Sequence, residues 1–65
     1  MFNITDKINK SVPAGYELIW LQNQHKIVLF INGVPHSFIN LSKNNAEDSI
    51  EKAVMLLEGQ GTVIG

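Results

Sequence analysis

The feature that most constrains the fold is the dipeptide Asn32-Gly33, which stands between two apolar segments. Both residues tolerate the positive φ angles of a type I′ turn, which joins two neighbouring antiparallel strands. The segment before it, residues 27–31, is an unbroken apolar run. Such a run is typical of a strand that is buried on both faces. The sequence therefore predicts an antiparallel hairpin at the centre of the molecule.

Aromatic and branched residues predict a further strand before this hairpin. The three expected strands cover about 16–22, 26–32 and 34–41, and a two-residue turn at Asn23-Gln24 joins the first two. Pro35 has no N–H for a ladder hydrogen bond, so the third strand is expected to be an edge strand, or at least to start near the margin of the sheet.

A C-terminal amphipathic helix is expected over about 45–58. Asn44 or Asn45 suits its N-cap, and Gly59 suits its end. Its expected apolar stripe consists of Ala46, Ile50, Ala53, Val54 and Leu57, with Leu56 beside it. The fold class is therefore α+β, a three-stranded antiparallel meander packed on one helix, in a single small domain over 1–65.

A short N-terminal helix is a further possibility, with Thr5 as its N-cap. Ile4, Ile8 and Val12 recur every four residues and would form one apolar stripe. A turn at 13–15 then leads into the first strand of the meander.

Alternation along the expected strands makes both faces of the sheet apolar. The face expected to meet the helix carries Tyr16, Leu18, Trp20, Ile27, Leu29, Ile31, Val34, His36 and Phe38. The residues predicted to bind a second copy or a partner on the other face are Ile19, Leu21, Val28, Phe30 and Ile39. One helix covers only one face, and a monomer rarely exposes such a patch. The N-terminal segment, a second copy or another protein could cover it.

The exposed side of the helix is a second candidate surface. The residues expected there are Glu47, Asp48, Glu51 and Met55. A solvated charged face is the simplest interpretation of the acids. The functional interpretation is an acidic patch with a flexible apolar contact that binds a protein partner.

Composition excludes several classes of site. The chain has no cysteine and two histidines, and neither histidine has an acidic neighbour at metal-ligand spacing, so no metal or other cofactor is expected. No serine or threonine lies in a nucleophile motif, and we expect no enzyme activity. The absence of arginine and the net charge of −1 argue against nucleic acid as a partner. No apolar run reaches membrane-spanning length and no signal peptide is evident, so the expected location is cytoplasmic.

Three functions follow from these observations as hypotheses. The favoured one is a small protein–protein interaction module, a homo-oligomeric regulator or inhibitor that binds another protein. The composition of the chain, which is rich in isoleucine, asparagine and lysine, is compatible with an origin in a phage or mobile element. One alternative is a domain that stacks single-stranded nucleic acid on its sheet through Phe30 and Lys26. The other is a small-ligand binder or sponge at an oligomer interface, lined by Tyr16, Trp20 and His36.

Overall fold

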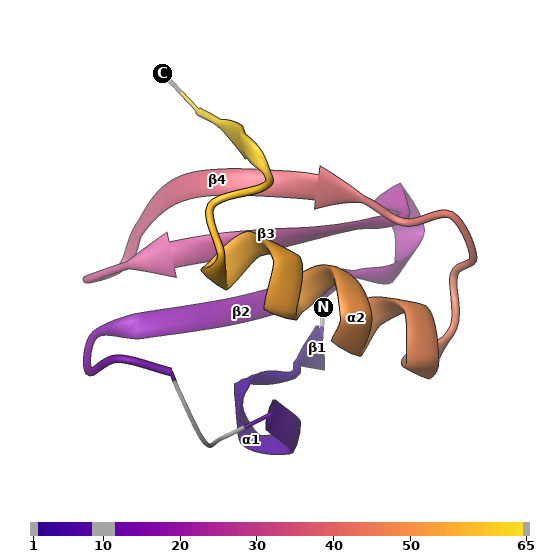
Figure 1. The fold of residues 1–65 in the computed structure, drawn as a ribbon, viewed down its shortest axis with the longest axis horizontal. Coiled ribbons are helices and arrows are strands. Elements are labelled where there is room, and N and C mark those ends of the chain that lie inside the picture. The colour runs from indigo at the N-terminus through magenta and orange to yellow at the C-terminus, as the bar shows by residue number, and fades with distance from the viewer. Residues whose placement is uncertain (1, 9–11, 65) are drawn as a thin grey trace.

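The computed structural model describes residues 2–8 and 12–64. In chain order these form β1 (Phe2–Asn3), α1 (Thr5–Ile8), β2 (Tyr16–Leu21), the 3₁₀ turn η1 (Gln22–Gln24), β3 (Lys26–Ile31), β4 (Val34–Asn40), α2 (Ala46–Leu57) and β5 (Thr62–Val63). The strands make one antiparallel sheet in the order β1-β2-β3-β4-β5. Helix α2 crosses one face of this sheet (Figure 1).

The α+β class, the antiparallel sheet and the single main C-terminal helix are confirmed, but the prediction of three strands is wrong. The described residues form five strands, because β1 and β5 add two residues each at the two edges. Strands this short carry no periodic signal. Strand β4 is therefore not an edge strand, but its first residues lie at the margin of the sheet, which is the alternative that Pro35 predicted. Strand β5 pairs with Ser37 and Phe38, and the last hydrogen bond, from Ile64 N to His36 O, stops short of Pro35.

The hairpin turn forms as predicted. Asn32 and Gly33 have φ angles of 53° and 80°, the positive values of a type I′ turn. The register between β2 and β3 is also as predicted, with Tyr16 opposite Ile31 and Trp20 opposite Ile27. The loop between these strands is longer than the expected two-residue turn and ends at His25, which has a left-handed conformation.

A β-bulge in β4 overturns the predicted faces of the third strand. Ile31 lies opposite Val34 and Phe30 opposite Pro35, but Leu29 then lies opposite Ser37. His36 is the extra residue, so every side chain after it changes face relative to an unbroken ladder. The residues that face the helix are consequently Ser37 and Ile39, not His36 and Phe38.

Helix α2 is capped at both ends by its own sequence. The side chain of Asn45 accepts a hydrogen bond from the backbone N–H of Asp48, with 2.8 Å between oxygen and nitrogen. At the other end Gly59 has a φ of 82°, and the N–H groups of Gly59 and Gln60 bond to the carbonyls of Leu56 and Met55. This is a Schellman motif, which needs a left-handed residue and therefore favours glycine.

The buried side of α2 is rotated from the predicted stripe. Its buried residues are Ser49, Ala53 and Leu56, whereas Val54 is 38% exposed and Ala46 is exposed. Ser49 can be buried because its hydroxyl donates to Ala46 O at 2.7 Å. Its small side chain also lets the helix lie close to the sheet. Leu56, which was expected beside the stripe, lies at its centre.

The N-terminal segment packs on the same side of the sheet as α2. Ile4 is 1% exposed and belongs to the core, and Ile8 packs against that core. The Thr5 hydroxyl accepts a hydrogen bond from Leu18 N at 2.8 Å, which ties the segment to β2. Ile4 and Ile8 therefore do not cover the second face of the sheet. Residues 9–11, between them and Val12 in the predicted stripe, lie outside the described residues.

Candidate functional site

The second face of the sheet is the leading candidate surface, and we call it the open face. Pairing and alternation place nine residues of the three long strands on it: Glu17, Ile19 and Leu21 of β2, Lys26, Val28 and Phe30 of β3, and Pro35, Phe38 and Asn40 of β4. They form three rows across the strands. The middle row, Ile19, Val28 and Phe38, is entirely apolar.

Helices α1 and α2 both lie on the opposite side, so neither described helix covers the open face. Val28 is nevertheless only 6% exposed, yet it is not part of the core cluster under α2. Its neighbours on the open face, Ile19 and Phe38, are half-buried. The middle row is therefore a close-packed apolar surface in its own right.

Two charged residues lie on the open face, in different rows. Glu17 is opposite Phe30, and its carboxylate accepts a hydrogen bond from Asn3 Nδ2 at 2.6 Å. Lys26 is opposite Leu21, and its ammonium lies 5.1 Å from the centroid of the Phe38 ring, a cation–π distance. The charges of these two side chains cancel, so the open face has no net charge at neutral pH.

The structure brings four of the five predicted residues together on this face: Ile19, Leu21, Val28 and Phe30. Ile39 was wrongly assigned to it, because the bulge turns Ile39 towards α2, where it packs against the core. Phe38 lies on the open face instead of Ile39, and it was not predicted there because the bulge was not predicted. The apolar pattern of residues 34–41 does not indicate that His36 is an extra residue. The one local sign is Pro35, directly before it, which cannot donate a hydrogen bond to the neighbouring strand.

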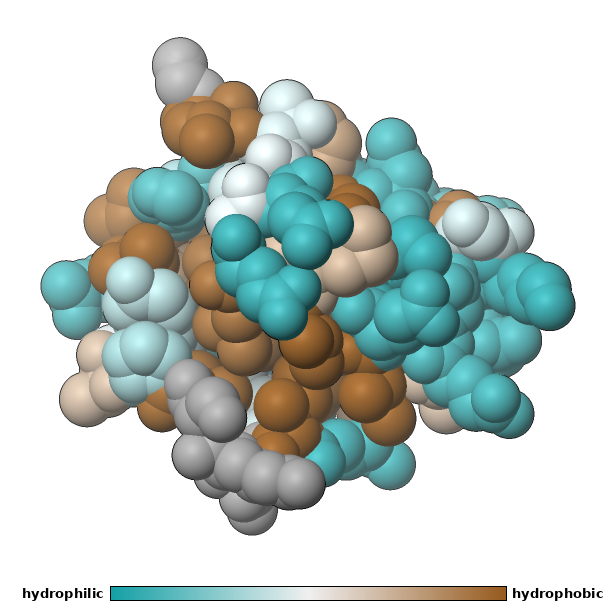
Figure 2. All heavy atoms as spheres, viewed as in Figure 1, coloured by the Kyte–Doolittle hydropathy of each residue, from teal (hydrophilic) through white to brown (hydrophobic). Residues whose placement is uncertain are grey.

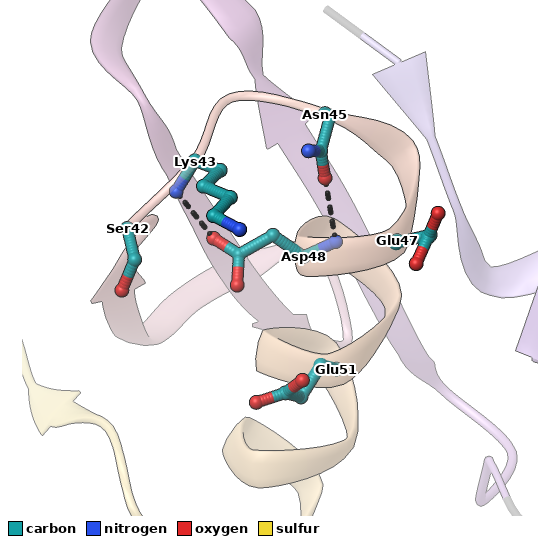
Figure 3. Close-up of a pocket in the computed structure, with 6 residues that line it drawn as sticks. All are labelled: Ser42, Lys43, Asn45, Glu47, Asp48 and Glu51. Carbon is teal, nitrogen blue, oxygen red and sulfur yellow. Dashed lines mark hydrogen bonds between the residues drawn. The ribbon is translucent and has the colours of Figure 1, made fainter.

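The predicted acidic surface surrounds the N-terminal end of α2. A shallow hollow of about 250 Å³ lies there, lined by Ser42, Lys43, Asn45, Glu47, Asp48 and Glu51 (Figure 3). Met55 is half-buried one turn beyond Glu51 and does not line the hollow. Hydrophilic side chains gather at this end of the helix-bearing face (Figure 2).

Asp48 has a structural role in this hollow. Its carboxylate accepts a hydrogen bond from Lys43 N at 2.8 Å and forms an ion pair with Lys52 at 2.9 Å. The backbone N–H of Lys43, followed by the Lys52 ammonium, lowers the pKa of Asp48 below its ordinary value. The hydrogen bond that the Lys52 ammonium donates to Asp48 raises the pKa of Lys52 above its ordinary value. Asp48 therefore fixes the loop before α2, and the structure explains its position without a partner.

The remaining candidate side chains are dispersed. His36 is exposed at the bulge, not on the helix-facing side as predicted, and its Nδ1 lies 3.3 Å from Ser37 Oγ. Trp20 lies in the core, where its Nε1 donates to Asn44 Oδ1 at 3.0 Å. In the described ranges no three histidine, cysteine or acidic residues are grouped to hold a metal ion. The helices in these ranges are also too short and too polar to cross a membrane.

Comparison of the chain with protein-family models finds no match, and neither do comparisons with curated proteins and with solved structures. Function is therefore inferred from the chemistry of the two surfaces described above.

Proposed function

We propose that this chain is a small protein-interaction module that associates with a second copy of itself through the open face. The single observation that carries the proposal is the close-packed apolar row at the centre of a face that no described helix covers. Val28 is already buried in the monomer, so the apolar area that association would remove from water is the part of Ile19 and Phe38 that is still exposed.

The small size of the molecule is consistent with this proposal. The Cα positions extend over 27 × 27 × 20 Å, and the sheet occupies the broad side, seen along the shortest axis in Figure 1. The open face of the three long strands is part of that outline. A small domain without cysteine also gains stability from such an interface, since its own core rarely supplies more than about 3–5 kcal/mol.

The charge of the face favours protein over nucleic acid. Phe30, Phe38 and Lys26 share the open face and could stack unpaired bases, which keeps the nucleic-acid alternative as a second candidate. A surface that follows a phosphate backbone needs an excess of positive charge, however, and Glu17 cancels Lys26 here. A regulatory or inhibitory role towards another protein remains a prediction, as do the absence of enzyme activity and the ligand-sponge alternative.

Sedimentation equilibrium of the wild type and of Phe30→Asp tests the proposal. We expect a wild-type dimer and a monomeric Phe30→Asp variant, because an aspartate in the apolar interface would be buried without a partner. The matched control is Val34→Asp, which places the same charge on the other face of the sheet, where Val34 is 63% exposed. It should remain dimeric, and circular dichroism should show that both variants are folded.

A wild type that sediments as a monomer up to millimolar concentration would overturn the proposal. Binding of labelled single-stranded oligonucleotide by that monomer, lost in Phe30→Asp and weakened by salt, would favour the nucleic-acid alternative instead.

A further inference from the structure

The outer edge of β4, along which β5 lies, is only partly occupied by the chain's own backbone. Strand β5 pairs with Ser37 and Phe38, and the N–H of Ile64 donates to the carbonyl oxygen of His36 at 2.9 Å. Backbone groups alternate between the two sides of a strand, so Phe38 and Asn40 direct theirs to the same edge as His36. Strand β4 runs on to Asn40, but no described strand pairs with Asn40 on this side.

The position of Gly61 explains why β5 pairs no further than Phe38. A Cβ atom on Gly61 would clash with the side chain of Leu56 and would lie 2.7 Å from the carbonyl oxygen of Phe38. The chain thus passes closely between α2 and β4 before it reaches the edge of the sheet (Figure 1). It joins that edge beside Phe38, and the last two residues of β4 remain uncovered.

Strand β5 buries little side-chain surface. Both of its residues are exposed, Val63 by 66%, and the following Ile64 is exposed by 45%. The bond from Gln60 N to Met55 O fixes the chain up to the hinge at Gly61, a residue type with wide conformational freedom. A segment with so few buried contacts opens locally at a free energy below that of global unfolding. Its opening exposes the edge of β4, and unpaired N–H and C=O groups on such an edge are a template for another strand.

We propose that the outer edge of β4 binds an extended segment of another protein, which replaces β5 and pairs antiparallel with β4. A segment that continues straight past Phe38 also pairs with Asn40, so it forms more backbone hydrogen bonds than β5 does. Its residue at the position of Thr62 lies opposite Phe38, on the open face. An apolar side chain there extends the apolar middle row, so the segment carries an apolar residue opposite Phe38.

Binding of a synthetic peptide to the full-length chain tests this site. The peptide has the sequence of residues 58–65 with Thr62→Phe, so that a straight peptide reaches from His36 to Asn40. The protein is the Ile64→Pro variant, which has lost the N–H that bonds to His36 O and therefore holds its own β5 more weakly. We expect this variant to bind the peptide on the order of tenfold more tightly than the wild type, whose edge is already occupied.

Nuclear magnetic resonance locates the bound peptide. The amide signals of His36, Phe38 and Asn40 should shift, and the Asn40 N–H should gain protection from hydrogen exchange. The matched control is the same peptide with Ile64→Pro, which cannot donate to His36 O and should bind much more weakly.

Three results would overturn the site. One is the absence of these shifts at millimolar peptide, and another is equal binding of the control peptide, since strand pairing requires the missing N–H. The third is an Ile64→Pro chain that does not fold, which would show that β5 cannot be displaced. The proposed dimer is judged separately, because the peptide should bind equally well when Phe30→Asp is added, and a monomeric wild type leaves this edge unchanged.

Discussion

The rotation of α2 relative to its expected stripe leads to a prediction with a measurable size. Leu56 is 2% exposed within the core, whereas Val54 is 38% exposed on the same helix. Leu56→Ala removes three buried carbon atoms, which at ~0.8 kcal/mol each cost about 2.4 kcal/mol. The cavity that remains raises the loss of unfolding free energy to about 3 kcal/mol.

Val54→Ala is the matched control in the same helix. It removes two carbon atoms that are only partly buried, a loss of about 1 kcal/mol. Alanine has a helix propensity higher than that of valine by about 0.5 kcal/mol, which leaves a net cost of about 0.5 kcal/mol. The two substitutions should therefore differ by roughly 2.5 kcal/mol.

Urea unfolding followed by Trp20 fluorescence and circular dichroism measures this difference. All variants must be compared at one protein concentration, because dimerisation adds to the apparent stability. A Val54→Ala variant as destabilised as Leu56→Ala, or a Leu56→Ala variant that loses less than about 1 kcal/mol, would refute the orientation of the helix.

Two further predictions follow from the bulge and from the loop before α2. At protein concentrations low enough to favour monomer, Ile39→Asp should lower the free energy of unfolding in urea by more than Phe38→Asp, because only Ile39 packs against the core under α2, and the reverse ranking would contradict the bulge. Because the folded-state pKa of Asp48 is depressed, its carboxylate stabilises the fold above the ordinary value of 3.8, and this contribution is lost as the pH falls through the lower folded pKa. Asp48→Asn should therefore be less stable than the wild type at neutral pH, with the difference in urea midpoint shrinking below pH 3.8, and a difference independent of pH would count against the role of the charge.

The parts of the fold that could be predicted are those encoded by local chemistry. Asn32-Gly33 determines its own turn and, with it, the pairing next to the turn. Asn45 and Gly59 likewise determine the two ends of α2. Each of these signals acts within a few residues and needs no knowledge of the tertiary structure.

The parts that could not be predicted depend on how distant elements fit together. The bulge at His36 has no local signature beyond Pro35, so Phe38 and Ile39 were placed on the wrong faces. The burial of Ser49 was not predicted, because it depends on the bond from its hydroxyl back to Ala46. At the candidate site, the apolar centre could be identified from alternation in β2 and β3, but the contribution of β4 could not.

The bulge has a consequence for the shape of the open face as well as for its composition. If His36 is left out of the count, the rest of β4 alternates like a regular strand, with Pro35 and Phe38 outward and Ser37 and Ile39 inward. His36 thus behaves as a one-residue insertion that preserves the chemistry of both faces. What an insertion of this kind adds is bend and twist in the strand that carries it. Deletion of His36 would therefore alter the curvature of the surface, and with it the partners it fits, without changing a residue on that surface.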